Sequence, residues 1–370
     1  MPDATDNFIN GLDLSEAFFH ECVEPVLRTE FERVKYSAGL LGSGSEVLGF
    51  DTEMSADHHW GPRVMLFVGA QDHGRHAHLI KQSFSEKLPR KFRGFPTSFS
   101  DADENENGVQ ILDYAETGPI NHRITVETVE HFFEMYLGLD IRKEIEAADW
   151  LSFPEQKLRS IVSGRIFHDE ARLEFHRQKF SYYPHDLWLY LLASQWSRIE
   201  QEEHLMGRAG SVGDEIGSAI IAARLVRDLM QLSFLMEKTY APYPKWFGTA
   251  FKQLNVAVVL KPLFEQILCS AQWTDREKYF CQVYEYLAQC HNQLGITETM
   301  STKVALFHDR PFLVISTGAF SKAIVARIED PALRKLAQKP LIGGVSQFSD
   351  STNLQSDRIW RPGLRNLYKS

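Results

Sequence analysis

Apolar residues follow two different periods along the chain, and the change between them falls near residue 145. Before that point, short apolar runs of strand length alternate with segments in which apolar residues recur every three or four positions. The pattern predicts strands at 64–68, 92–99, 108–114 and 123–126, helices at 14–31, 72–88 and 127–137, and an apolar run at 36–41 that leads into a Gly-Ser turn. Strands interleaved with helices indicate a sheet domain that ends near residue 145.

From residue 149 onward the helical period dominates. It is clearest at 154–164, 184–206, 212–239, 244–268, 274–293 and 318–328. Pro242 and Pro244 separate one helix from the next, because proline cannot donate to the helix ladder and restricts the residue before it. The tail from residue 341 is rich in Gly, Ser, Asp and Asn, which favours a loop or a wrapping arm. We therefore expect a sheet domain at 1–145, a helical domain at 146–340 and a tail at 341–370.

Composition narrows the class of protein. A chain of 370 residues that is 44% hydrophobic can bury one large core or two moderate ones, and two domains fit it better. The net charge of −9 argues against a large basic surface for duplex nucleic acid. The four cysteines show no CxxC spacing, which favours structural thiols. We see neither a secretory leader nor an apolar segment long enough to span a bilayer, so we expect a cytoplasmic protein that does not bind membranes.

The stretch 41–68 carries the clearest chemistry. Gly42 and Gly44 permit tight turns and close approach of the backbone, while Ser43 and Ser45 offer hydroxyls and amides near an expected helix start. Asp57 follows after a loop and precedes the strand at 64–68, so its carboxylate would point towards whatever the loop holds. Magnesium binds carboxylates together with phosphate oxygens. The order predicts a phosphate-binding loop followed by a metal ligand, and the alternative for the loop is a simple turn.

Asp57 and His59 each have alternatives. Asp57 could cap the start of the strand or form an ion pair with Arg63 instead of holding a metal ion. His59 has the same strand parity as Asp57, so both would point to one face of an extended segment. The imidazole could bind Mn²⁺ or Zn²⁺, carry a proton near neutral pH, or hydrogen-bond a backbone carbonyl.

This spacing resembles the nucleotidyltransferase superfamily, whose pattern is a hydrophobic residue, Gly, Gly or Ser, and then, after a gap, two acids separated by one residue. Leu41-Gly42-Ser43 or Ser43-Gly44-Ser45 opens the pattern here, Asp57 takes the first acidic place and His59 takes the second. Imidazole is a poorer Mg²⁺ ligand than carboxylate, so the chain departs from the superfamily's metal site.

The superfamily pattern also implies a third acid from a later strand. We favour Glu127, with Asp113 as its rival, and this carboxylate would take the proton from the attacking hydroxyl of the acceptor. The alternative for Glu127 is a surface residue that opens the next helix, where acids are favoured.

A closer resemblance covers most of the chain. The stretches that carry it are GSGSEVLGFD (42–51), SADHHWGPR (55–63), FRGFP (92–96), YYPHDLWLYLLASQW (182–196), GDEIGSAIIAARLVRDLM (213–230), YAPYPKWFGTAF (240–251) and FHDRPFLV (307–314). They resemble a mainly bacterial family catalogued as domain of unknown function four-zero-three-seven and grouped with the nucleotidyltransferases. The resemblance implies an α+β fold, in which an N-terminal nucleotidyltransferase-like mixed sheet with helices is followed by an all-α helical bundle.

The helical half offers further candidates for phosphate binding. Arg224 and Arg227 lie one turn apart and could face the phosphates, as basic groups do in phosphoryl transfer. Their alternative is an ion pair with a nearby acid: Asp214, Glu215 or Asp228. Lys245 beside Trp246 resembles a family motif, and its alternative is a surface lysine with a buried stem. The expected nucleotide-binding set is Gly42, Ser43, Gly44, Ser45, Arg63, Arg224, Arg227 and Lys245.

The resemblance implies transfer of a nucleoside monophosphate from an NTP, expected to be ATP, to an unknown acceptor with Mg²⁺ or Mn²⁺. Asp57, His59 and Glu127 would be the catalytic residues. The main rival is a protein that kept the fold, lost turnover, and now senses a nucleotide or binds a partner, and His59 favours it. A third function, RNA cleavage by Arg198 and His204, is disfavoured because the acids between them would repel RNA phosphates.

Overall fold

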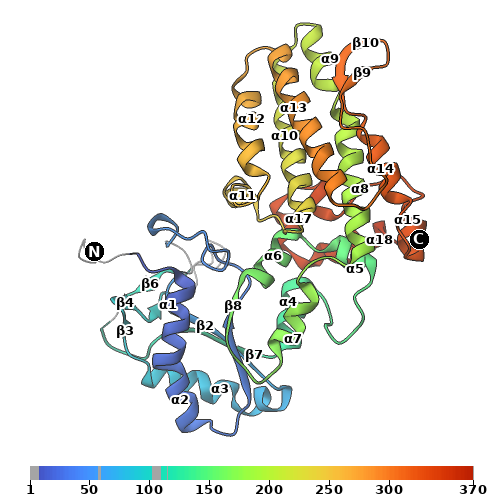
Figure 1. The fold of residues 1–370 in the computed structure, drawn as a ribbon. Helices are drawn as coiled ribbons and strands as arrows, with labels where there is room; N and C mark the ends of the chain where they lie inside the picture. Colours follow the sequence, from blue (N-terminus) through green and yellow to red (C-terminus); the bar gives the residue numbers. More distant parts are fainter. Residues whose placement is uncertain (1–7, 57–59, 102–109, 115, 370) are drawn as a thin grey trace. The chain divides into compact units, whose positions relative to one another are not determined.

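The computed structural model describes residues 8–56, 60–101, 110–114 and 116–369, which fold as two compact units. The first unit comprises Met1–Glu144 and Lys157–Ser181, and the second comprises Ile145–Gln156 and Tyr182–Ser370. Figure 1 shows their elements. Strands of a mixed sheet and many helices together confirm the α+β class.

The main sheet of the first unit has the strand order β7-β2-β1-β8. Its strands are β1 (Tyr36–Leu40), β2 (Arg63–Val68), β7 (Arg123–Glu127) and β8 (Arg165–Asp169). Strand β1 pairs antiparallel with β2 and with β8, whereas β2 and β7 are parallel. The short strands are β3 (Lys91–Phe92), β4 (Phe95–Pro96), β5 (Ser98–Phe99) and β6 (Leu112–Asp113).

Side chains of β2 and β7 alternate between the two faces of the sheet. Val64 and Leu66 of β2 join Ile124 and Val126 of β7 in a buried core. Helices from the same unit contribute to this core: α1 (Gly11–Phe18), α2 (Glu24–Glu30) and α3 (Ala70–Lys87). Because successive side chains of a strand point to opposite faces, Arg63, Arg123 and Glu127 lie on the other face.

The other face of the sheet also meets helices of the first unit. These are α4 (Val129–Leu137), the part of α6 (Glu155–Ser163) from Lys157 onward, and α7 (Leu173–Arg177). The ring of Phe67 on β2 packs edge-to-face on Phe132 of α4, with centroids 5.7 Å apart. Arg63 pairs in register with Arg123, so the two arginines lie side by side at one end of this face.

The second unit is a helical bundle with a short β-hairpin. Its helices are α5 (Ala147–Ser152), α8 (His185–Glu202), α9 (Leu205–Ser211), α10 (Glu215–Met236), α11 (Pro244–Phe251), α12 (Ala257–Cys269), α13 (Trp273–Gln293), α14 (Thr317–Val325) and α15 (Pro331–Leu336). The hairpin consists of β9 (Ala305–Phe307) and β10 (Arg310–Val314). Fully buried Trp196 of α8 stacks on Phe320 of α14 at 4.7 Å, which joins two helices distant in sequence.

The C-terminal tail belongs to the second unit. It forms α16 (Val345–Phe348), α17 (Thr352–Ser356) and α18 (Arg361–Leu367) rather than a loop. The amide of Gln347 donates to the backbone carbonyl of Leu191, 3.0 Å away, and to the side chain of Gln195. Arg361 forms a buried ion pair with Asp149. These contacts fix the tail to α8 and α5.

The observed units differ from the expected boundaries at residues 157–181, which lie in the first unit. The reason is β8, a strand that the sequence did not predict, which pairs with β1. Two predicted elements are also divided: 244–268 forms α11 and α12, and 92–99 forms β3, β4 and β5.

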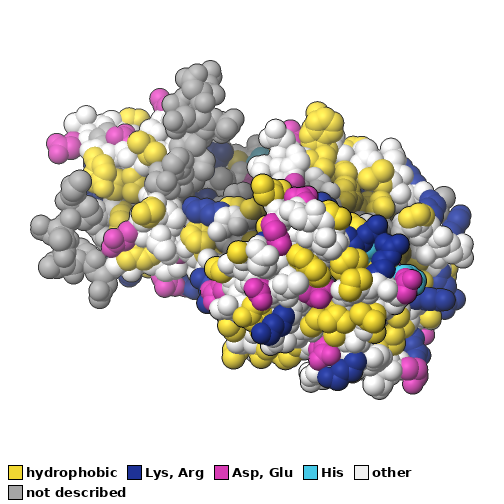
Figure 2. All heavy atoms as spheres, turned by 90° about the horizontal axis from the view of Figure 1, so that it is seen from above, with side chains coloured by type: hydrophobic (Ala, Val, Ile, Leu, Met, Phe, Trp, Pro, Cys, Tyr) yellow, Lys and Arg dark blue, Asp and Glu magenta, His cyan; other side chains and the backbone are white. Residues whose placement is uncertain are grey.

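Two surface observations bear on the expected partners. Among the described residues, none of the helices combines the length and apolar character that a membrane-crossing segment requires. Figure 2 shows basic and acidic side chains interspersed with apolar ones on the viewed face. The apolar residues exposed on the helical unit include Val212, Ile216 and Val258.

Gly210 tests the packing of the helical unit. A methyl group at Gly210 of α9 would overlap the indole of Trp273 on α13, whereas no described atom lies within 4 Å of the same position at Gly248 of α11. Overpacking costs about 1–3 kcal/mol, so Gly210→Ala should lower the free energy of unfolding by that amount. Gly248→Ala should leave it unchanged or raise it by up to about 1 kcal/mol, because alanine favours helix. Urea denaturation measures both, and equal stability of the two variants would contradict this packing.

Candidate functional site

The loop after β1 has the backbone conformation that its glycines predict. Gly42 has φ +80° and Gly44 has φ +149°, both in a region that favours glycine. Turns follow the loop, so the expected helix start is wrong. The Gly42 amide donates to the carbonyl of Ser160, 3.1 Å away, and the Phe50 amide donates to the carbonyl of Ser45 at 3.0 Å. The loop is therefore held by its own backbone bonds and by α6.

An ion pair between Arg63 and Glu46 fills the space inside the loop. Arg63 Nε lies 2.9 Å from Glu46 Oε1, and Arg63 Nη2 donates to the Ser43 carbonyl at 2.8 Å. Glu46 is buried, with 4% of its surface exposed. A methyl group at Gly44 would overlap both members of this pair. Gly44 thus makes room for the ion pair, a role that sequence alone did not indicate.

A cavity of about 200 Å³ opens beside this ion pair, within the first unit. Its lining includes Gly42 and Ser43 of the loop, Arg63 of β2 and Arg123 of β7. Burial, followed by the positive charge of Arg63, lowers the pKa of Arg123 to about 10, while Glu46 opposes this shift. Two guanidinium groups close enough to repel each other would be stabilised by a bound anion.

Aromatic residues of α4 form another wall of this cavity. Phe132 and Tyr136 line it, and their rings stack with centroids 5.4 Å apart. The Tyr136 hydroxyl makes hydrogen bonds with the side chains of Ser160 and Ser43, and burial raises the pKa of this phenol. Tyr136 therefore connects the loop to α4 and α6.

Glu127 is the last residue of β7, two positions beyond Thr125, which lines the cavity. Burial raises the pKa of its carboxyl group, while His131, Lys81 and a hydrogen bond with Thr125 act in the opposite direction. Thr128, not Glu127, caps α4: its side chain accepts from the His131 amide at 3.1 Å. Glu127 is thus a half-buried strand residue rather than the acid that opens the helix.

The predicted metal ligands, Asp57 and His59, lie outside the described residues. The residues on either side are fixed to α1: Trp60 Nε1 donates to Asp51 Oδ2 at 3.0 Å, and the Gly11 amide donates to the same oxygen at 2.7 Å. Within the described part of the chain, no group of three or more His, Cys, Asp or Glu side chains could hold a metal ion. The predicted metal site therefore depends on Asp57 and His59.

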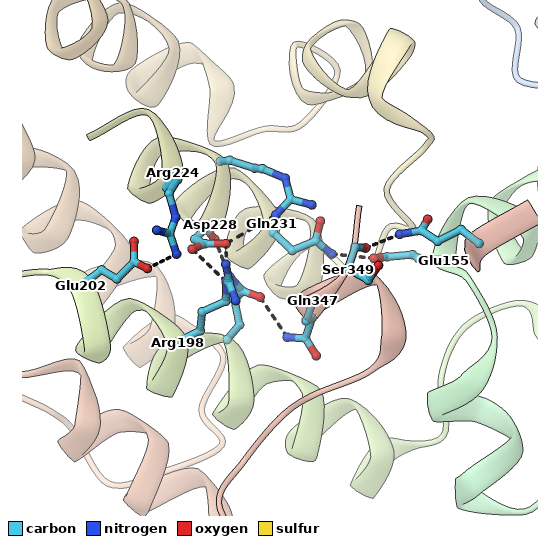
Figure 3. Close-up of polar contacts among 11 residues, drawn as sticks. Glu155, Arg198, Glu202, Arg224, Asp228, Gln231, Gln347 and Ser349 are labelled. Carbon is cyan, nitrogen blue, oxygen red and sulfur yellow. Dashed lines mark hydrogen bonds and ion pairs between the residues drawn. The ribbon is translucent and has the colours of Figure 1, made fainter. Parts of the chain in front are cut away.

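The basic candidates of the second unit have partners within that unit. Arg224 forms an ion pair with Glu202, and Arg227 Nη1 lies 3.9 Å from Asp228 Oδ1. Lys245 Nζ lies 4.9 Å from the centroid of the Trp246 ring. Figure 3 shows the contacts around Asp228. The roles of these three residues in nucleotide binding stay predictions.

Two of the three acids that we considered as partners for these arginines act elsewhere. Asp214 caps α10 by accepting from the Gly217 amide at 2.8 Å, and Glu215 Oε2 pairs with Arg276 at 2.6 Å. Asp228 is bound mainly by Arg198, whose Nε lies 2.9 Å from Oδ1 and 3.0 Å from Oδ2. The expectation of an intramolecular partner is met at both arginines: Arg227 pairs with Asp228, as considered, and Arg224 pairs with Glu202, which we did not consider.

Comparison with known proteins adds a family match. Residues 150–247 match the family described as Domain of unknown function (DUF4037), which confirms the resemblance over this part of the chain. One similar solved structure is a nucleotidyltransferase-like protein from Exiguobacterium sibiricum, 10% identical, with a TM-score of 0.32 over 84% of this chain and 91% of that one. No curated protein matches the chain.

Gly44→Ala should disrupt the loop. The new methyl group meets the Arg63–Glu46 pair, and alanine strains the backbone at φ +149°. We expect the free energy of unfolding to fall by about 2–3 kcal/mol, as for an overpacked site with a strained backbone. Gly49→Ala is the control, because Gly49 has φ +72° and no described atom within 4 Å, so only the backbone penalty of about 1 kcal/mol applies. Urea denaturation compares them, and equal losses would contradict the role of the ion pair.

Glu127→Gln should change how stability depends on pH. The pKa of this buried carboxyl group is raised above its ordinary value of 4.5, so folding binds a proton. The contribution of this carboxyl group to stability is complete at pH values below its pKa in the unfolded chain. That contribution is lost as pH rises through the pKa that the group has in the folded protein. Glutamine removes that loss, so the variant should gain stability relative to the wild type as pH rises from the ordinary carboxyl value of 4.5 towards neutrality.

Glu134→Gln on the exposed surface of α4 is the matched control, because it makes the same chemical change without burial. Urea denaturation across this pH range measures the difference in free energy of unfolding between each variant and the wild type. If the stability of Glu127→Gln relative to the wild type does not change with pH, or falls as pH rises, that result would contradict the burial of this carboxyl group.

Proposed function

We propose that the protein is a metal-dependent nucleotidyltransferase that moves a nucleoside monophosphate from an NTP, preferably ATP, to an acceptor that is still unknown. The observation that carries this proposal is the first-unit cavity, where the Gly42–Ser43 loop, Arg63 and Arg123 come together. The family match adds no activity, because the function of that family is unknown.

The cavity suits the phosphates of a nucleotide. Guanidinium groups bind phosphate through two parallel N–H bonds and keep their charge when partly buried. Burial and the charge of Arg63 lower the pKa of Arg123, so its charged form is disfavoured, and a bound phosphate would favour that form. The same charges would stabilise the negative charge that develops during phosphoryl transfer.

The remaining roles follow the sequence pattern. Asp57 and His59 would hold Mg²⁺ or Mn²⁺, which would polarise a phosphate oxygen, and a carboxylate with an imidazole suits Mn²⁺ better than Mg²⁺. Glu127 would accept the proton of the acceptor hydroxyl. Its raised pKa brings this carboxyl group closer to working pH, which makes it a stronger base.

A second candidate is a protein that binds a nucleotide or a partner without turnover. His59 stands where the superfamily has its second acid. The loop also uses its own polar groups internally: the Gly42 amide donates to the Ser160 carbonyl, and the Ser43 carbonyl accepts from Arg63. Fewer loop groups then remain for a triphosphate, which favours this candidate.

Calorimetric titration with ATP and GTP tests the proposal, with Mg²⁺, with Mn²⁺ and without metal. We expect metal-dependent binding to the wild type and loss of the metal dependence in Asp57→Ala. Arg123→Gln should weaken nucleotide binding about 10–100-fold, because a hydrogen bond to a charged group is worth about 1.5–3 kcal/mol. Arg142→Gln, an exposed arginine paired with Asp140 in the same unit, is the control and should bind as the wild type does.

The outcomes separate the two candidates. Absence of nucleotide binding under every metal condition would overturn the proposal. Binding without metal, together with transfer activity that appears only in His59→Asp, would favour the protein without turnover. Metal-dependent binding that is lost in Asp57→Ala would justify a screen of acceptor hydroxyls.

A further inference from the structure

The second unit contains a cavity of its own, of about 170 Å³. Its lining includes Glu155 at the start of α6, Arg227 and Gln231 of α10, Phe247 of α11, and Asp350 of the tail. Space for one water corresponds to about 10–15 Å³ on this measure, so the cavity has room for roughly ten non-hydrogen atoms. That is the size of a small metabolite.

Arg227 brings a positive charge to the cavity. Its guanidinium lies 3.9 Å from Asp228, and among the described residues no other carboxylate is within 4 Å of it. Asp228 is 2% exposed and is already bound through both oxygens by Arg198, as Figure 3 shows. Because Arg198 neutralises most of the charge of Asp228, the five N–H donors of Arg227 can serve a ligand.

Two carboxylates bring negative charge to the cavity. Glu155 is 4% exposed, and one of its oxygens accepts from Gln231 Nε2 at 2.5 Å (Figure 3). The other accepts from the Ala241 amide at 3.0 Å. Asp350, which also lines the cavity, is exposed. The cavity thus combines one guanidinium with two carboxylates.

The groups of opposite charge belong to one part of the second unit. Arg227 and Gln231 are i and i+4 on α10, so their side chains start about 5–6 Å apart on one helix face, and Gln231 reaches Glu155. A small molecule with a carboxylate and an ammonium group would find a partner for each among these residues. Pro242, Pro244 and Phe247 add an apolar wall that suits a hydrocarbon side chain.

We propose that this cavity binds a free α-amino acid. A ligand with only negative charge would face Glu155 and Asp350 without compensation, and a ligand with only positive charge would face Arg227. The carboxylate of an amino acid pairs with Arg227, and its ammonium group is held by Asp350 and Glu155. The inference goes beyond the proposed transfer activity and does not depend on it, because every residue used here lies in the second unit.

Ligand-observed NMR and calorimetry test the proposal on the whole protein with the standard amino acids. We expect saturable binding of an amino acid with an apolar side chain. Its N-acetyl derivative, which lacks the ammonium group, and its decarboxylated amine, which lacks the carboxylate, should each bind at least tenfold more weakly. Absence of saturable binding for every amino acid would overturn the proposal, as would equal binding of either analogue.

Matched variants place the ligand in the cavity. Arg227→Gln should weaken amino-acid binding at least tenfold, whereas Arg224→Gln, one turn away and paired with Glu202, should not. Because Asp350 is exposed, Asp350→Asn should weaken amino-acid binding without affecting folding. Unchanged affinity in Arg227→Gln would overturn the proposal. Arg123→Gln in the first unit should retain amino-acid binding whatever happens to nucleotide binding, so the two proposals can fail separately.

Discussion

The parallel pairing of β2 with β7 is the constraint on which the first unit depends. Its register sets Arg63 beside Arg123 and Val64 beside Ile124. The apolar pair and its neighbours face α1, α2 and α3, so burial of that face fixes which way every other side chain points. A slip of one residue would exchange the two faces and place the arginines in the apolar core. The hydrophobic effect on one face therefore determines the electrostatics of the other, and the two guanidinium groups stay together although they repel.

The second unit is organised around a buried charge instead. Asp228, 2% exposed, lies on α10 and is bound by Arg198 of α8. A buried carboxylate is costly unless it is paired and hydrogen-bonded, so these two helices are fixed in both rotation and register. Glu155 plays a similar part for α10 and the segment before α11, through Gln231 and the Ala241 amide. Glu155 also lines the cavity of the second unit, so a carboxylate that holds the fold together shapes the proposed binding site.

Sequence reasoning found the features that depend on local pattern. The apolar runs of β2 and β7, the long helices, and the conformation of Gly42 follow from periodicity and residue type. Contacts between residues far apart were missed, because no period links Glu46 to Arg63 or β8 to β1. Arg123 could have been predicted as a site residue. Polar residues at 123 and 125 alternate with Ile124 and Val126, which is the pattern of a half-buried strand. The roles of Asp57 and His59 rest on the sequence pattern alone, because both lie outside the described residues.

The order of the segments has a consequence for how this protein can be dissected. The chain enters the second unit at Ile145, returns to the first at Lys157, and enters the second again at Tyr182. No single cut separates the units, and a fragment that ended at residue 145 would lack β8. The edge of β1 would then present unpaired N–H and C=O groups, which invite pairing with another chain and aggregation. The two units are distinct in their packing, yet neither is one continuous segment of the chain.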